Sequence, residues 1–269
     1  MALPAASPWP IVGHEEVLAL LPRLRAHALL FTGPEGVGRR LVARWYAVGL
    51  NRGFPPPYLP EHPDLLEIAP KERGLRGEKE VRLEEVEPLW DWFATHPRER
   101  VKVAILDAAH LLTEAAANAL LKLLEEPPAY ARLVLIAPSR DTLLPTLASR
   151  LLEVPFAPVL QEKLSALTQD PELLAYAAGA PGRLRRALQD PEGFQARMER
   201  AKEALRAGSL ARLSLLRELL AEEEGFFALY ALLRENPRGL LALEAAREAL
   251  ERYVNPEVVL ARLSVDLEP

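Results

Sequence analysis

The sequence predicts an α/β protein in which a parallel-sheet domain of the phosphate-loop type is followed by an all-helical part. Two observations predict this architecture. As far as Pro158, apolar strands alternate with helical segments, and each strand is apolar along its whole length, which is typical of a parallel sheet covered on both faces. From there to Pro269 we find only helical periodicity, interrupted by prolines and glycines.

The first elements surround a glycine-rich loop. Apolar residues at helical spacing predict a helix over 15–25, and the apolar run 27–32 predicts a buried strand. The loop 33–40 (GPEGVGRR) follows this strand, and residues 41–50 continue as a helix. A strand, a loop and a helix in this order form the context that a phosphate loop requires.

Proline-rich and polar segments separate the remaining elements of this domain. Residues 51–63 are expected to form a proline-rich loop, and a polar loop follows residue 68. Thr113 is placed to cap a helix that Pro127 and Pro128 end. The expected strands are 65–68, 101–107, 133–136 and 152–156, and the expected helices are 83–95 and 114–126.

The all-helical part divides at the turn 189–193 (QDPEG), which separates a small group of helices from a larger one. The expected domains are therefore a sheet domain over 1–158, a small helical domain over 159–192 and a C-terminal helical domain over 193–269. The expected helices are 160–168, 171–178, 181–188, 193–206, 209–220, 226–235, 238–252 and 256–265.

The composition excludes several classes of function. The absence of cysteine excludes disulfides, thiolate catalysis and zinc sites with cysteine ligands. The net charge of −5 argues against nucleic-acid binding through bulk electrostatics, so any DNA contact must come from a local basic patch. No apolar run approaches the ~18 residues that a membrane span needs, and we expect a cytoplasmic protein.

The loop 33–40 departs from a working phosphate loop at two positions. In the working form, G-x-x-x-x-G-K-[ST], the Lys reaches the β and γ phosphates and the hydroxyl ligates magnesium. Gly33, Gly36 and Gly38 are present, but Arg39 replaces the Lys and Arg40 replaces the hydroxyl residue. A guanidinium has the wrong charge to ligate magnesium, so we expect the loop to be non-functional. The octapeptide alone also fits a simple glycine turn before a helix.

A third position is changed after the strand 101–107. In phosphate-loop enzymes an apolar strand ends in two acidic residues, of which the first helps to hold magnesium and the second polarises the attacking water. Asp107 supplies the first, but Ala108 occupies the second position and accepts no proton. Without the upstream loop, Asp107 would be interpreted as the cap of the following turn.

Several stretches in this order resemble the delta-prime subunits of bacterial DNA polymerase III clamp loaders, which are members of the AAA+ group. The most specific is AAANALLKLLEEPP, at 115–128, because neither nucleotide binding nor helix propensity alone demands that string. The matching stretches are 27–40, 62–65, 103–128, 144–150 and 179–183.

The resemblance implies a fold, a role and a set of partners. It implies an AAA+ sheet domain, a helical lid domain and a C-terminal oligomerisation collar. It also implies a non-catalytic stator subunit, without ATPase or polymerase activity of its own, that assists ATP-dependent loading of the sliding clamp onto primed DNA. In this chain, Ser149 and Arg150 match the first two residues of the family's Ser-Arg-Cys motif, and the resemblance implies that Arg150 offers an arginine finger to a neighbour's ATP site. The implied partners are the gamma/tau ATPase subunits, the delta subunit, the sliding clamp and primer-template DNA.

The sequence also departs from the family's pattern. Leu151 replaces the cysteine that follows Ser-Arg, and the family's four-cysteine zinc module is missing, so we expect no zinc or other metal despite His62 and Asp64. No cofactor is expected, because ATP would be bound by neighbouring subunits. Ala137 and Pro138 stand where ATPase members place a polar sensor, while Arg183 matches a second sensor position.

Three alternatives stay open at this point. The chain could be an AAA+ ATPase in which Arg39 stands in for the lysine, or, more remotely, a small phosphotransferase. Arg150 could be a solvated arginine that closes the sheet. Direct DNA contact is a weaker hypothesis that rests on two clusters of basic residues, Lys71, Arg73, Arg76 and Lys79, and Arg183, Arg185 and Arg186.

Overall fold

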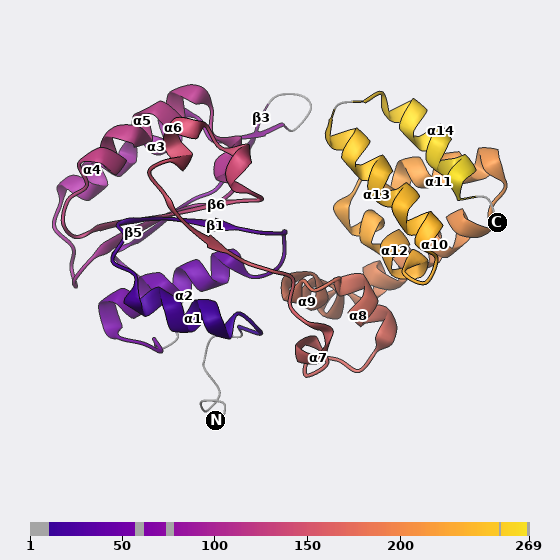
Figure 1. The fold of residues 1–269 in the computed structure, drawn as a ribbon, viewed down its shortest axis with the longest axis horizontal. Coiled ribbons are helices and arrows are strands. Elements are labelled where there is room, and N and C mark those ends of the chain that lie inside the picture. The colour runs from indigo at the N-terminus through magenta and orange to yellow at the C-terminus, as the bar shows by residue number, and fades with distance from the viewer. Residues whose placement is uncertain (1–10, 57–61, 74–77, 253, 268–269) are drawn as a thin grey trace. The chain divides into compact units, whose positions relative to one another are not determined.

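The computed structural model describes residues 11–56, 62–73, 78–252 and 254–267 (Figure 1). The chain divides into two compact units, Met1–Val159 and Leu160–Pro269. The first unit contains the sheet and the second is helical, as the sequence predicts.

The first unit is built on a parallel five-stranded sheet with the order β2-β5-β6-β1-β7. Its strands are β1 (Ala28–Thr32), β2 (Leu65–Ile68), β5 (Lys102–Leu106), β6 (Ala131–Ala137) and β7 (Leu152–Pro155). The predicted parallel sheet is therefore confirmed. The order itself, in which β1 lies between β6 and β7, is not visible in local sequence patterns.

Alternate residues of the central strands enter two different hydrophobic cores, which explains why these strands are apolar throughout. In β5, Ala104 and Leu106 belong to one core, and Val103 and Ile105 belong to the other. Helices α1 and α2 cover one face of the sheet, and α3 to α6 cover the other (Figure 1). The helices are α1 (Glu15–Leu20), α2 (Arg39–Arg52), α3 (Leu83–Val86), α4 (Pro88–Ala94), α5 (Glu114–Glu125) and α6 (Pro145–Ala148), with 3-10 turns η1 (Leu21–Arg23), η2 (Ala109–Leu111) and η3 (Arg140–Thr142).

Three of the predicted helices are wrong in their extent, and the one expected over 160–168 is only α7 (Gln161–Leu164). The helix expected over 15–25 tightens at Leu21 into the 3-10 turn η1, which contains Pro22. The helix expected over 83–95 is split into α3 and α4, because Pro88 has no N–H with which to continue the hydrogen bonds of α3. Helix α2 also runs two residues into the expected proline-rich loop and ends at Arg52.

The polar loop expected after residue 68 contains an antiparallel strand pair, β3 (Lys71–Arg73) and β4 (Glu78–Glu80). Its register sets residues of opposite charge across from one another, Lys71 with Glu80 and Glu72 with Lys79. Opposite charges stabilise such a pair, so the alternation of charge in KER and EKE was the signal that hydrophobic patterning missed.

The second unit consists of helices around one apolar core. Residues from the first helices, such as Tyr176 and Ala187, share this core with residues from the last, such as Leu260 and Leu263. The predicted division at 192/193 stays a prediction. The helices are α7 (Gln161–Leu164), α8 (Pro171–Ala177), α9 (Pro181–Gln189), α10 (Pro191–Arg206), α11 (Ser209–Leu219), α12 (Glu223–Leu233), α13 (Pro237–Glu251) and α14 (Pro256–Asp266).

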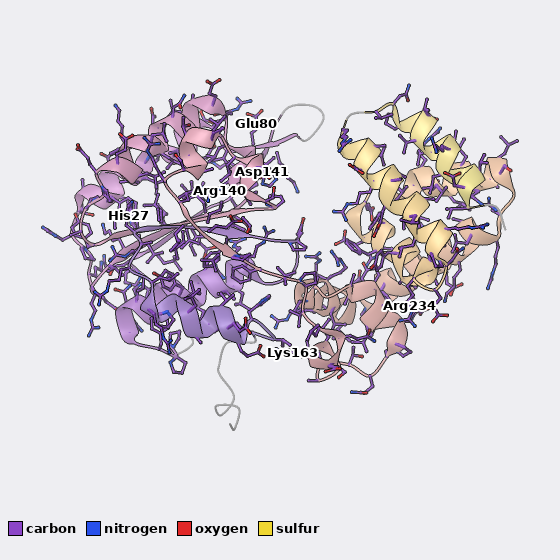
Figure 2. All side chains as sticks on the ribbon, viewed as in Figure 1. His27, Glu80, Arg140, Asp141, Lys163 and Arg234 are labelled. Carbon is purple, nitrogen blue, oxygen red and sulfur yellow. The ribbon has the colours of Figure 1, made fainter. Side chains whose placement is uncertain are left out.

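Side chains tie elements of the first unit together, and two of these residues, His27 and Arg140, are labelled in Figure 2. The ring of His27, just before β1, donates a hydrogen bond to the carbonyl oxygen of Leu124 in α5, at 3.0 Å. At the carboxyl end of β6, Arg140 donates from Nη2 to the carbonyl oxygen of Ala148, at 2.8 Å. The second contact fixes the end of α6, the helix that precedes Ser149 and Arg150. Within the described residues, no helix is long and apolar enough to cross a membrane.

Candidate functional site: a filled phosphate loop and an exposed arginine

The glycines of the loop 33–40 are required by the backbone. Gly33 has a φ of 135°, and a Cβ added to it would lie 2.2 Å from the carbonyl oxygen of Phe156. Gly36 and Gly38 also have positive φ angles, 78° and 105°. Gly33 donates its N–H to the carbonyl oxygen of Pro138, at 2.9 Å. The three glycines therefore allow the left-handed backbone of this loop, which joins the carboxyl end of β1 to α2.

Arg39, at the lysine position, is the first residue of α2 and is turned toward the end of β6. Its Nη1 donates to the carbonyl oxygen of Ala137. Burial lowers the pKa of Arg39 from its ordinary value, and the nearby carboxylates of Asp107 and Glu35 partly oppose that change. The guanidinium of Arg39 is thus hydrogen-bonded to a backbone carbonyl of its own chain.

Arg40, at the hydroxyl position, is paired with two carboxylates. Its Nε and Nη2 lie 2.8 Å and 2.7 Å from Oε2 of Glu67, and its Nη1 lies 3.6 Å from Oδ2 of Asp107. Arg44, one turn further along α2, is hydrogen-bonded to the other oxygen of Glu67. Cations of the protein therefore already neutralise both carboxylates, and a magnesium ion beside Asp107 would be repelled by Arg40.

Ala108 places a methyl group, with no carboxylate, at the second acidic position. Its φ of 52° is in the left-handed region, and its N–H lies 3.0 Å from Oδ1 of Asp107. Asp107 thus binds the turn that follows it, as the alternative interpretation proposed, and also pairs with Arg40. The methyl group of Ala108 cannot orient a water molecule for attack on a phosphate.

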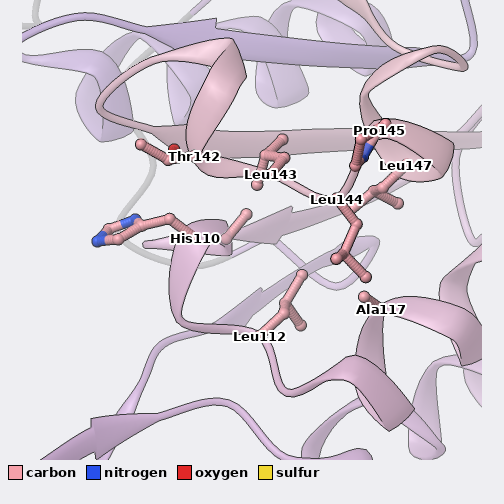
Figure 3. A pocket seen from close by; sticks show the side chains of 9 residues that line it. His110, Leu112, Ala117, Thr142, Leu143, Leu144, Pro145 and Leu147 are labelled. Carbon is pink, nitrogen blue, oxygen red and sulfur yellow. The ribbon is translucent and has the colours of Figure 1, made fainter.

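His110 is a titratable group near the site that the sequence analysis missed. Partial burial and the charge of Arg39 lower its pKa, although Asp107 opposes them and part of the residue is open to solvent. It lies at one side of an apolar pocket of about 240 Å³, together with Thr142 (Figure 3). The pocket is otherwise lined by apolar residues of η2, α5 and the segment that leads into α6, so it offers little to a phosphate.

Arg150 follows α6, and its hydrogen bonds go to residues outside the phosphate loop. Its Nη2 lies 2.7 Å from Oε1 of Glu125, at the end of α5, and its Nη1 donates to the carbonyl oxygen of Thr146, at 2.8 Å. Ser149 donates from Oγ to the same carbonyl, at 3.0 Å. The Arg150 side chain is 37% exposed. Among the described residues, none of its hydrogen bonds goes to the chain's own phosphate loop.

Comparisons with known proteins agree with the resemblance found in the motifs. A family model described as DNA polymerase III, delta subunit, matches residues 59–160. The chain is 34% identical over 180 residues to DNA polymerase III subunit delta' of Pseudomonas aeruginosa, covering 58% of this chain and 54% of that protein. It is 31% identical over 209 residues to subunit tau/gamma of Haemophilus influenzae, covering 66% and 29%. The chain is thus related in sequence to DNA polymerase III subunits of the delta' and tau/gamma kinds. It spans about half the length of the first relative and less than a third of the second.

Two solved structures from Thermotoga maritima share the fold of this chain. A DNA polymerase III gamma subunit-related protein matches 93% of this chain and 82% of its own, with a TM-score of 0.50 and 22% identity. The RuvB Holliday junction branch migration motor matches 96% and 90%, with a TM-score of 0.50 and 17% identity. At these identities the likeness shows the AAA+ fold and says nothing about activity.

Arg183, the second sensor position of the family, is buried in the core of the helical unit. Its Nη1 donates to the carbonyl oxygen of Ala177, at 2.8 Å, and its Cζ lies 3.1 Å from the ring centroid of Phe227. Only 2% of the residue is exposed. A guanidinium held in this way stabilises the packing of α8, α9 and α12.

His62 and Asp64 hold a loop. The Asp64 carboxylate accepts hydrogen bonds from the backbone N–H groups of Arg98 and Glu99, both at 2.8 Å. The ring of His62 accepts from the N–H of Asp64 through Nδ1, at 3.2 Å, and its Nε2 lies 3.3 Å from Oε2 of Glu99. Across the described ranges, no group of three or more His, Asp or Glu residues has the geometry of a metal site. The expected absence of zinc stays a prediction.

Several residues of the two basic clusters are engaged within the protein. Lys71 lies 3.2 Å from Glu85, and Arg186 lies 3.3 Å from Glu224. Arg76 and the side chain of Arg73 lie outside the described residues. Because ion-paired and buried arginines release few counterions, these clusters are weak candidates for a phosphate-backbone contact.

Proposed function

We propose that this chain is a non-catalytic, delta-prime-type stator subunit of a clamp loader, and that it offers Arg150 to the ATP site of a neighbouring gamma/tau subunit. The observation that supports the proposal is a contrast between two sites. In the chain's own phosphate loop Arg39 binds the carbonyl of Ala137 and Arg40 binds the carboxylate of Glu67, whereas Arg150, with a side chain 37% exposed, makes its hydrogen bonds outside that loop.

The physics suits the residue. A guanidinium stays charged at all physiological pH values, and its planar fork matches phosphate oxygens. An arginine supplied from outside an ATP site stabilises the charge that develops on the γ phosphate, which accelerates hydrolysis by about 10³-fold or more. In the proposed complex the delta subunit, the sliding clamp and primer-template DNA are the further partners, and the complex works in the cytoplasm.

The experiment is a reconstitution with gamma/tau subunits in which only the site next to this chain can hydrolyse ATP. The other ATPase subunits carry a substitution of their phosphate-loop lysine. We expect Arg150→Ala to lower ATP hydrolysis by about 10³-fold while the complex still assembles, as measured by size-exclusion chromatography. Arg98→Ala, at an exposed arginine of the same unit, serves as the control. Unchanged hydrolysis in Arg150→Ala would refute the assignment.

The same preparation tests the competing function, an ATPase that uses its own loop. We expect the isolated chain to show no steady-state ATP hydrolysis. Arg40 pairs with the carboxylates of Glu67 and Asp107, and Ala108 cannot activate water. Turnover that disappears in Asp107→Asn would establish the ATPase instead.

A further inference from the structure

We propose that Glu125 is the resting partner of Arg150, and that the arginine exchanges this carboxylate for a γ phosphate when the chain meets an ATP-loaded neighbour. The inference rests on the proposed function and extends it. It assigns a role to a residue of the string LLEEPP, which neither nucleotide binding nor helix propensity explains.

The geometry defines one resting position for the guanidinium. Nη2 is held by Oε1 of Glu125, at 2.7 Å, and Nη1 is held by the Thr146 carbonyl, at 2.8 Å, with Ser149 Oγ at 3.3 Å. The carbonyl and the hydroxyl belong to the turn that carries the arginine, so they move with it. Glu125 is 25 residues away in sequence, at the end of α5. Its contact with Arg150 is the one of the three that an incoming anion can replace.

The position of Glu125 also favours a cation beside it. It is the last residue of α5, and Glu126 follows it as the C-cap. A carboxylate at the C-terminus of a helix is destabilised by the helix dipole, because the partial charge there is negative. Pro127 and Pro128 follow the end of the helix, and the carboxylate pairs with Arg150, which follows α6. The guanidinium of Arg150 offsets this unfavourable placement.

The carboxylate and the γ phosphate would compete for Nη2 of the Arg150 guanidinium. A carboxylate and a phosphate both accept two parallel N–H donors from arginine, but the terminal phosphate of ATP carries more negative charge. The side chains of Arg150 and Glu125 are 37% and 52% exposed, so release leaves the carboxylate in water at little cost. A neighbour that holds ADP offers no γ phosphate, and the resting pair then persists. Glu125 would thereby weaken docking to an ATP-loaded neighbour and leave docking to an ADP-loaded neighbour unchanged.

The test compares Glu125→Gln with Glu126→Gln, which removes the same charge from the adjacent exposed residue. The affinity of the full chain for an isolated gamma/tau subunit is measured by fluorescence anisotropy, with ADP or with a non-hydrolysable ATP analogue. We expect Glu125→Gln to bind the analogue-loaded subunit about two- to five-fold more tightly, as suits an exposed ion pair, and the ADP-loaded subunit unchanged. We expect Glu126→Gln to behave as the unsubstituted chain.

The Arg150→Ala background separates the two proposals. There, Glu125→Gln should have no effect on affinity, because the competing guanidinium is gone. An equal effect of both glutamine variants, or an effect that persists without Arg150, would overturn the role of Glu125 alone. Failure of Arg150→Ala to lower hydrolysis at the neighbouring site would instead overturn the proposed function.

Discussion

Replacing Arg40 with alanine removes the cation that Glu67 and Asp107 share beside the phosphate loop. Glu67 is the more consequential partner, because its side chain is only 16% exposed, and the variant leaves it with Arg44 as its remaining cation. Asp107 loses a weaker contact, at 3.6 Å, and keeps its hydrogen bond to Ala108.

The expected cost follows from these contacts. A hydrogen bond to a charged partner contributes about 1.5–3 kcal/mol when it is protected from water. The Arg40 side chain is 48% exposed, so solvent screening reduces this contribution. We expect Arg40→Ala to lower the free energy of unfolding by about 1–1.5 kcal/mol, which corresponds to a fall of about 2–6 °C in the midpoint of thermal unfolding for a unit of this size.

The assay is thermal unfolding followed by circular dichroism at low and high salt. Arg25→Ala is the matched control, since Arg25 is an exposed arginine of the same unit that forms no ion pair with any described residue. We expect the difference between the two variants to shrink in high salt, because part of the interaction is open to solvent. Equal midpoints for Arg40→Ala and Arg25→Ala would show that Arg40 does not stabilise the loop, and the account of a filled magnesium site would fail.

Two further predictions concern other parts of the protein. Arg52 hydrogen-bonds to Glu99 and holds the pKa of that carboxyl below its ordinary value of 4.5. Because Glu99 takes up a proton at higher pH when unfolded than when folded, the pair stabilises the fold above about pH 5 and loses this effect as pH falls through the lowered pKa. Urea unfolding should therefore show Arg52→Gln destabilised at neutral pH and equal to the unsubstituted chain in strong acid; a pH-independent difference would contradict this. In the helical unit, Arg212 is 3% exposed and donates to the carbonyl oxygens of Ala204, Ala207 and Ser264. Arg212→Met should cost about 2–4 kcal/mol in urea unfolding, whereas Arg206→Met, at an exposed site on α10, should cost almost nothing; a similar small loss in both would show that these carbonyls do not need the arginine.

The sheet domain could be predicted from the sequence because its signals are local. A strand that is buried on both faces must be apolar along its length, and β1, β5 and β6 are. The cap of α5 was also predictable, since Thr113 accepts a hydrogen bond from the N–H of Ala116. The strand pair β3–β4 was missed because all of its residues are charged, and a search for apolar residues passes over them.

The candidate site was predictable in its residues and only partly in its chemistry. Arg39, Arg40 and Ala108 stand at known positions of a motif, so the absence of a lysine, a hydroxyl and a second carboxylate at these positions follows from the sequence alone. Arg183 shows the limit of such matching, because its position fits a sensor while its side chain is buried against Phe227. Position in a motif determines which side chain is available, and packing determines what it contacts.

What the sequence by itself determined is the fold class, most of the helices and strands, and the replacement of three residues of the phosphate-loop motifs by Arg39, Arg40 and Ala108. The tertiary structure decided which groups fill that loop and which hold Arg150. Arg40 meets Glu67 across 27 residues, and Arg150 meets Glu125 across 25, because the strand order β2-β5-β6-β1-β7 brings their elements together. Local propensity and periodicity carry no information about such pairs, since they describe each segment separately and the pairing depends on how the segments pack.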